Sequence, residues 1–136
     1  MNDGRHVEPE ILPICARHGI GVTVFSPLAQ GLLTGKYNVG APPESRGARS
    51  DWLKRDLTEE NVARVRRLTA LAKDLGLEMA QLALAWILRR PEISAVITGA
   101  TNPAHVLSNV KAAGVKLTSD VLEEIEGILE NAPAHG

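Results

Sequence analysis

The sequence has a single cysteine, Cys15, among its 136 residues. One cysteine excludes an intrachain disulfide and a CxxC metal site, and it makes a reducing cytoplasm the compartment that we expect. Cys15 lies beside the apolar residues Ile11, Leu12 and Ile14 on a helical segment. That setting is more typical of a small core residue than of a nucleophile.

The chain also lacks an excess of charge and any long hydrophobic run. Its formal net charge is −1, which provides no basic excess for nucleic acid or an anionic membrane. No apolar run reaches the length of a membrane span, and residues 1–6 lack the hydrophobic region of a signal peptide. We therefore expect no nucleic-acid partner and no membrane insertion.

What is present fits one globular domain. Apolar residues make up 44% of the chain and charged residues 23%, which argues against disorder and against a coiled coil. The spacing of apolar residues predicts helices over Val7–His18, from Thr58 to Gly76, over Met79–Arg89, over Ala104–Ala112, and from Thr118 to Leu129, with strands over Ile20–Phe25 and Ser94–Thr98. We expect residues 131–136 to form a tail.

The alternation of strands and helices predicts an α/β fold with right-handed crossovers. The nearly continuous apolar run of Ser94–Thr98 predicts a strand buried on both faces, as in a parallel sheet covered by helices. Only two strands are found, however, and two parallel strands make a poor independent sheet. The sequence therefore indicates part of a larger fold.

Two turns that follow the strands have a composition suited to an anionic ligand. Ser26 and the backbone donors of Leu28–Gly31 could line a diphosphate, and the amides after the helix-capping Asn102 present a positive helix end. Lys36 and Arg46, in a glycine- and proline-rich loop, could cover such a ligand. Taken singly, a serine after a strand is usually a turn residue, and a loop lysine is usually solvated.

These segments together resemble the aldo-keto reductases, especially the branch that includes the voltage-gated potassium channel beta subunits. The resemblance begins with Phe25-Ser-Pro-Leu-Ala-Gln-Gly-Leu-Leu-Thr-Gly-Lys-Tyr37. It continues in the family's order through Gly40, Pro42-Pro43, Ser45-Arg46, Gln81-Leu-Ala-Leu-Ala-Trp86 and Ile97-Thr-Gly-Ala-Thr-Asn-Pro103. It covers residues 7–130, nearly the whole chain.

The resemblance implies the C-terminal part of a (β/α)8 TIM barrel. The two strands would be the seventh and eighth, and residues 31–50 would be the cofactor-covering loop after strand seven. Because such barrels have about 250 residues, residues 1–136 would form a partial domain of an incomplete barrel.

The resemblance also implies an NADP(H) site. Its diphosphate would contact Ser26, Pro27, Leu28, Gln30 and Gly31, with Lys36 and Arg46 as a belt, and its adenosine 2′-phosphate and adenine would contact Gly99, Thr101, His105, Ser108 and Asn109. His105 replaces a common arginine or glutamine, and Ser108 replaces a common adenine-reading glutamate. A neutral histidine attracts phosphate less than arginine does, so the choice between NADP and NAD stays open. The alternative is that His105 is simply an exposed helical residue.

No catalytic residue is predicted within the chain. The family uses a tyrosine, a lysine, an aspartate and a histidine from earlier barrel strands. Tyr37 falls in the family's cofactor loop rather than at the proton donor, and Asp51 and His18 match no catalytic position. Without a placed acid, hydride transfer to a carbonyl lacks its accompanying proton.

Three hypotheses follow. In the first, the chain is the cofactor-binding part of an NADP(H)-dependent reductase of aldehydes or ketones, inactive alone, whose partner is a missing N-terminal barrel half. In the second, it is a non-catalytic nucleotide-binding or regulatory module. In the third, it is a barrel remnant that buries two open strand edges in a homo-oligomer. The substrate pocket would come largely from absent loops.

Overall fold

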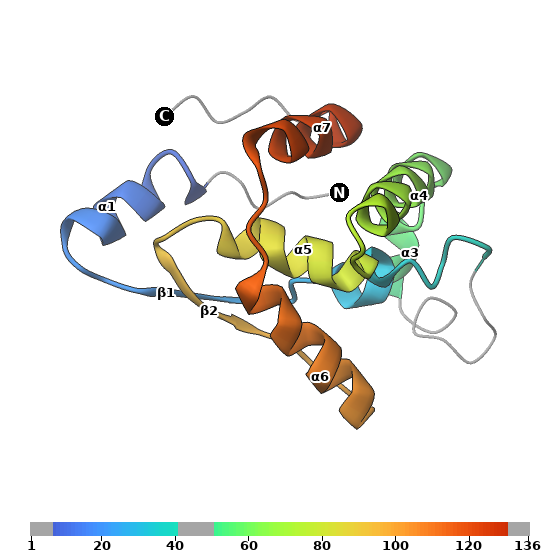
Figure 1. The fold of residues 1–136 in the computed structure, drawn as a ribbon, viewed down its shortest axis with the longest axis horizontal. Coiled ribbons are helices and arrows are strands. Elements are labelled where there is room, and N and C mark those ends of the chain that lie inside the picture. The colour runs from blue at the N-terminus through green and yellow to red at the C-terminus, as the bar shows by residue number, and fades with distance from the viewer. Residues whose placement is uncertain (1–6, 41–50, 131–136) are drawn as a thin grey trace.

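The computed structural model describes residues 7–40 and 51–130, and of residues 51, 52 and 54 only the backbone (Figure 1). The elements are α1 (Ile11–Arg17), β1 (Val22–Phe25), the 3-10 helix η2 (Ala29–Thr34), α3 (Asp51–Asp56), α4 (Glu59–Asp74), α5 (Met79–Leu88), β2 (Ile93–Ile97), α6 (Pro103–Lys111), the 3-10 helix η3 (Ala112–Gly114) and α7 (Ser119–Leu129). The predicted α/β fold is confirmed.

The two strands form a parallel pair. Thr23 lies opposite Ala95 and Phe25 lies opposite Ile97, with an irregularity of register between Val22 and Thr23. The helices α3, α4 and α5 lie in the chain between the two strands. Because the strands are parallel, both end at the same edge of the sheet.

The prediction that the second strand is buried on both faces is wrong for this chain. Ile97 is 60% exposed and Phe25 on the neighbouring strand is 79% exposed. Ser94 and Ala95 are exposed as well, although α5 packs against β2. An apolar strand has the capacity for burial, but only a packed neighbour removes its side chains from water.

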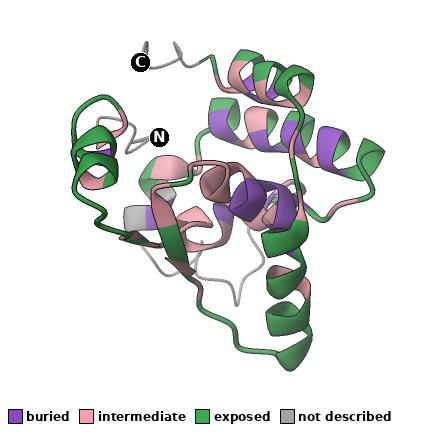
Figure 2. Ribbon diagram, turned by 60° about the vertical axis from the view of Figure 1, so that its left-hand side comes forward, coloured by how far each residue is buried: buried purple, intermediate pink, exposed green. Residues whose placement is uncertain are grey.

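The main hydrophobic core is formed by helices rather than by the sheet. Its buried members come from α4, α5 and α7, which lie together in Figures 1 and 2, and they are Leu68, Leu71, Ala72, Met79, Leu82, Ala83, Ile125 and Ile128. Trp86 packs against this cluster. The guanidinium of Arg89 lies 3.7 Å from the Trp86 ring centroid, a cation–π contact that the sequence did not indicate.

Several element boundaries differ from the sequence prediction. Helix α1 begins at Ile11 rather than Val7, which places Pro13 in the first turn, where a missing N–H costs no helical hydrogen bond. Residues 31–34, predicted as loop, belong to η2. None of the helices in the described ranges has the length and apolar character that crossing a bilayer requires.

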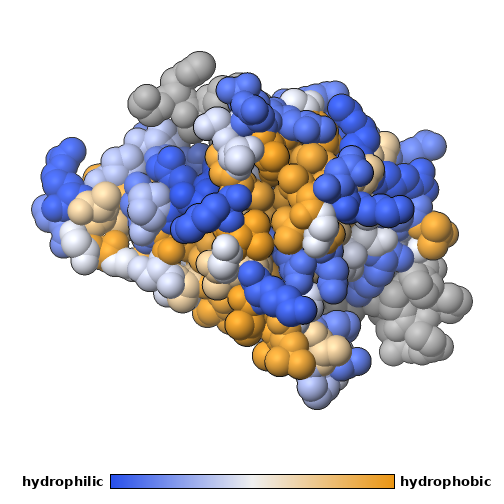
Figure 3. Space-filling view, in the orientation of Figure 1, coloured by the Kyte–Doolittle hydropathy of each residue, from blue (hydrophilic) through white to orange (hydrophobic). Residues whose placement is uncertain are grey.

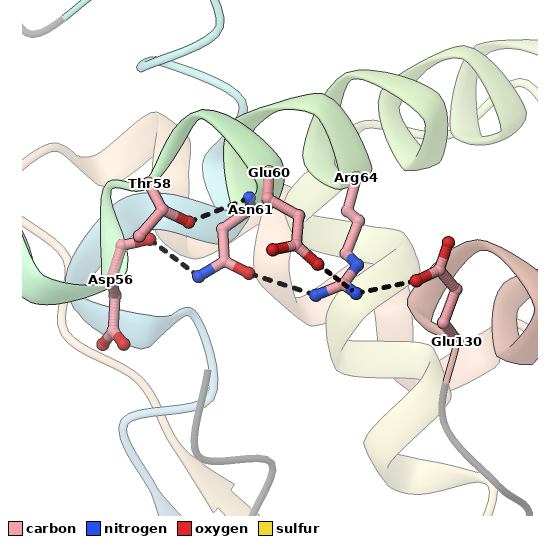
Figure 4. A network of polar contacts seen from close by, with 6 residues as sticks. All are labelled: Asp56, Thr58, Glu60, Asn61, Arg64 and Glu130. Atoms are coloured by element: carbon pink, nitrogen blue, oxygen red, sulfur yellow. Dashed lines mark hydrogen bonds and ion pairs between the residues drawn. The ribbon is translucent and has the colours of Figure 1, made fainter.

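The start of α4 is fixed by its N-cap residue, Thr58. The Thr58 hydroxyl accepts a hydrogen bond from the Asn61 backbone N–H at 3.1 Å (Figure 4). The buried Asn61 side chain donates to the backbone carbonyl of Asp56 at 2.9 Å. This small network joins the end of α3 to the beginning of α4.

Arg64 continues the network toward the C-terminal helix. Its guanidinium pairs with Glu60 one turn earlier at 2.6 Å and with Glu130, immediately after α7, at 3.0 Å (Figure 4). The Arg64 side chain is 21% exposed, whereas both carboxylates are largely exposed. The ion pairs therefore contribute little to net stability.

Removal of the Thr58 cap is expected to destabilise the chain. Thr58→Ala should lower the free energy of unfolding by about 1 kcal/mol, because one of the first α4 amides loses its acceptor. Thr58→Ser should stay close to the parent value, since serine supplies the same acceptor. Urea unfolding followed by circular dichroism measures both, and equal losses in the two variants would contradict a capping role.

Candidate functional site

The strand register brings the two predicted site turns to one edge. Phe25 and Ile97 are opposite each other in the parallel pair, so the turns that begin at Ser26 and Thr98 leave the sheet side by side. Sites in parallel α/β proteins are built from loops in this position, at the carboxyl ends of the strands. The structure thus places the first residues of both predicted turns in proximity.

The turn after β1 has an unusual backbone. The φ angles are 54° at Ser26, 45° at Ala29 and 56° at Gln30, and 100° at Gly31. Among the described residues, the one other non-glycine residue with positive φ is Glu130. A non-glycine residue in this region costs on the order of 1 kcal/mol or more, and such residues cluster at ligand sites. This concentration of strain indicates a functional constraint on the turn.

Hydrogen bonds inside the turn engage some of its predicted backbone donors. The N–H of Ala29 donates to the Ser26 carbonyl at 3.1 Å, and the N–H groups of Gly31 and Leu33 donate to the Leu28 carbonyl at 2.8 and 3.2 Å. A ligand at this turn would therefore compete with the turn itself for the amides of Ala29 and Gly31. The exposed Ser26 side chain and nearby cations are better placed to bind it.

Lys36 lies across Gly31. A Cβ atom added to Gly31 would be 2.8 Å from both Cε and Nζ of Lys36. Glycine allows this approach without a shift of the lysine side chain, and the positive φ also favours glycine. The Lys36 Nζ is 4.9 Å from the centroid of the Tyr37 ring. The structure therefore places a positive charge directly on the strained turn.

The segment that carries Lys36 is anchored to α4. Tyr37 is 2% exposed and packs in a second buried cluster, whose other members are Leu32, Leu53 and Val65. The next residue, Asn38, accepts a hydrogen bond from Arg66 Nε through its carbonyl at 2.7 Å, and its amide donates to Thr69 Oγ1 at 3.1 Å. The burial of Tyr37 fits a packing role, and sequence reasoning missed the anchoring by Arg66 and Thr69.

The turn after β2 has the capping geometry that the sequence predicts. The Asn102 side chain accepts from the Ala104 N–H at 2.9 Å, and Pro103 is the first residue of α6. Gly99, Thr101 and His105 are exposed. The N-terminus of α6 is thus open to solvent, with its partial positive charge available to an anion.

Ser108 and Asn109 lie further along α6 and are half-buried. The Ser108 hydroxyl donates to Oε2 of Glu78 at 2.8 Å and accepts from Nε2 of Gln81 at 3.1 Å. Its hydroxyl is therefore engaged with the start of α5. No role of Glu78 and Gln81 was predicted from the sequence, although their three-residue spacing at a helix start is that of a capping pair.

The other predicted contacts to the diphosphate are Pro27, Leu28, Gln30 and Arg46. Pro27, Leu28 and Gln30 lie within the strained turn and are half-buried, whereas Arg46 lies outside the described residues. In the part of the chain that the structure describes, no three His, Cys, Asp or Glu side chains gather as a metal site would require.

Comparisons with known proteins agree on one family. The sequence model of the Aldo/keto reductase family matches residues 1–130. A probable voltage-gated potassium channel subunit beta of Arabidopsis thaliana is 45% identical over 136 residues, and the one of Oryza sativa subsp. japonica is 41% identical over 136 residues. A putative subunit of the same description from Schizosaccharomyces pombe is 38% identical over 135 residues.

These relatives are much longer than this chain. The alignments cover 94 to 95% of the chain but 42%, 42% and 39% of the three relatives, respectively. The chain therefore spans about two-fifths of the length of the curated relatives that it matches.

Alanine substitutions at three glycines separate contact from backbone strain. Gly31→Ala should lower the free energy of unfolding by about 1–2 kcal/mol from its positive φ alone, and more if Lys36 cannot move. Gly19→Ala, with φ of 64° and nothing within 4 Å, measures the strain without the contact. Gly127→Ala, inside α7, should instead stabilise by about 0.5–1 kcal/mol. Chemical denaturation ranks the variants, and a Gly31→Ala loss no larger than that of Gly19→Ala would show that Lys36 moves without cost.

Proposed function

The chain belongs to the aldo/keto reductase family, and we propose that it forms the cofactor-binding portion of an NADP(H)-dependent reductase of aldehydes or ketones. The strained turn after β1, with the Lys36 ammonium lying across it, is the observation that carries this proposal. A cation over a turn held in an unfavourable backbone conformation is suited to a bound diphosphate.

We infer that β1 and β2 are the seventh and eighth strands of a (β/α)8 barrel. Their parallel pairing, and the exposure of the apolar side chains Phe25 and Ile97, support membership of a larger sheet. The chain covers about two-fifths of the length of the relatives, as a part of such a barrel would.

The diphosphate of the cofactor would lie along Ser26, Pro27, Leu28, Gln30 and Gly31. Ser26 would donate its hydroxyl, and Gly31 would permit Lys36 to approach the phosphates. Arg46 is proposed as the second cation of the covering loop. This turn suits the diphosphate because it combines a hydroxyl donor (Ser26), a glycine that allows close approach (Gly31) and a cation (Lys36).

The adenosine end would bind at the turn after β2 and along α6. Gly99, Thr101, His105 and Asn109 are the proposed contacts, with the exposed N-terminus of α6 directed at the 2′-phosphate. Ser108 fits less well as a contact to adenine, because its hydroxyl already bonds to Glu78 and Gln81. Selectivity for NADP over NAD would then depend on His105 and Thr101.

The bound cofactor would supply a hydride from C4 of its nicotinamide ring. The residues of this chain would bind and orient it, and they would hold the phosphates while the ring faces the missing part of the barrel. Tyr37 is buried in the cluster around Leu32 and serves packing. We propose that the tyrosine acid of the reaction, with its lysine, aspartate and histidine, comes from outside residues 1–136.

Two alternatives remain open to test. The relatives carry the name of voltage-gated potassium channel beta subunits, which favours a non-catalytic nucleotide-binding or regulatory module as the second candidate. Self-association is the third, because apolar side chains gather in a band that reaches α6 in Figure 3. Phe25, Ile97 and Leu107 are also exposed, at 79%, 60% and 69%. A monodisperse monomer in light scattering would count against self-association.

NADPH is expected to bind to the purified chain. Titration at concentrations up to about millimolar should change NADPH fluorescence, and Lys36→Met should weaken binding about tenfold, because a charged contact to phosphate is worth at least about 1.4 kcal/mol. Lys73→Met, which removes an exposed lysine from the last turn of α4, is the matched control and should bind like the parent chain. No fluorescence change with the parent chain would remove the support for a nucleotide site.

Carbonyl reduction by the chain alone is not expected. NADPH absorbance at 340 nm should not fall faster when an aldehyde or ketone is added, since the proton donor is proposed to lie elsewhere. Addition of a separately produced N-terminal barrel half from a longer relative should restore turnover in the first hypothesis and leave it absent in the regulatory one. Carbonyl-dependent oxidation by the chain alone would refute the proposed division of the site.

A further inference from the structure

Helix α6 extends from the rest of the molecule without burying any residue of its own. None of its nine residues is buried, and Val106, Leu107 and Val110 are 50%, 69% and 66% exposed (Figure 2). Apolar burial therefore contributes little to its attachment. The position of α6 must depend on specific contacts with its neighbours, chiefly α5 and η3.

The Gln81 side chain makes the most extensive of these contacts. Gln81 is 6% exposed, and its Nε2 donates to both the carbonyl and the hydroxyl of Ser108 at 3.1 Å. Its Oε1 accepts from the N–H of Glu78 at 3.0 Å. The amide oxygen of Gln81 is thus bonded at the start of α5, and its amide nitrogen is bonded to Ser108 on α6.

The Glu78 carboxylate closes this polar cluster. It accepts from the Ser108 hydroxyl at 2.8 Å, so Ser108 is bound from two sides by residues at the start of α5. A carboxylate acceptor strengthens such a bond. The Gln81 bond to the Ser108 backbone carbonyl does not depend on the Ser108 side chain. Gln81 is therefore the contact that would hold α6 even if residue 108 were changed.

We propose that Gln81 is a positioning residue that sets the placement of α6, and through it the affinity of the chain for the adenosine end of its nucleotide. The proposal rests on the proposed function for the nucleotide part. The N-terminus of α6 follows the turn of Gly99 and Thr101, and a shift of α6 moves the helix end together with His105. The diphosphate turn and Lys36 belong to a different segment, anchored on α4 through Tyr37, Asn38 and Arg66.

Because the two segments have different anchors, loss of one anchor should weaken the binding of one end of the nucleotide only. Loss of the Gln81 amide should weaken a ligand that contains only the adenosine half, such as 2′,5′-ADP, but not one that contains only the nicotinamide half, such as nicotinamide mononucleotide. A general loss of stability would weaken both. The ratio of the two affinities is the readout that a purely structural role would not move.

The experiment uses the full chain with Gln81→Leu, which keeps a side chain of similar size without its donors and acceptor. Ile128→Val, a mild change in the core on α7, is the matched control for lost stability. Hydrogen exchange by mass spectrometry should show at least a tenfold faster exchange over residues 103–111 in Gln81→Leu, with α4 unchanged. Ser108→Ala should give a smaller increase, because the bond to the Ser108 carbonyl remains.

Binding measurements complete the test. The Kd of 2′,5′-ADP should rise about tenfold in Gln81→Leu, while that of nicotinamide mononucleotide stays within twofold, and Ile128→Val should change neither. Unchanged exchange over residues 103–111, or an equal loss for both ligands, would overturn the positioning role. If the parent chain binds neither ligand, the proposed function and the nucleotide part of this inference both fail, and the exchange rates still decide whether Gln81 places α6.

Discussion

The parallel register of β1 and β2 is the constraint on which the candidate site depends. Phe25 lies opposite Ile97, so the strands end together and their turns leave the same edge of the sheet. Residues more than 70 positions apart in the sequence meet there only because of this pairing. Of the helices in the connection, α5 packs against β2, while the sheet itself is small and open.

The residues that form the main core differ from those that form the candidate site. Burial among α4, α5 and α7 supplies the main core, whereas the site segments are attached to it by a few directed contacts. Tyr37 anchors the Lys36 segment on α4, and Gln81 anchors α6 on α5. Such attachment leaves the surfaces of these segments exposed while limiting where they can lie. In the proposed function, the Tyr37 anchor serves the diphosphate and the Gln81 anchor serves the adenosine end. We therefore expect that binding of the two ends of the nucleotide can be weakened separately.

Much of the local structure could be predicted because the relevant signals are short in range. Thr58 and Asn102 cap the helices that their sequences indicate, since capping involves residues only two or three positions apart. The exposure of Ile97 could not be predicted, because a strand's composition does not state which neighbours are present. The contact of Ser108 with Glu78, about 30 residues earlier, could not be predicted either, because it requires α5 and α6 to be adjacent.

The sequence by itself determined the family, the order of the two strands and of the helices other than α3 and the 3-10 helices, the caps at Thr58 and Asn102, and the residue types of the two turns. Tertiary structure alone decided that Ser26, Ala29 and Gln30 take positive φ angles and that Lys36 lies over Gly31. The reason is physical: local propensity reflects nearest neighbours, whereas backbone strain persists only where packing elsewhere compensates for its cost. The strain in this turn is therefore visible in the tertiary structure but could not be predicted from the residues that form the turn.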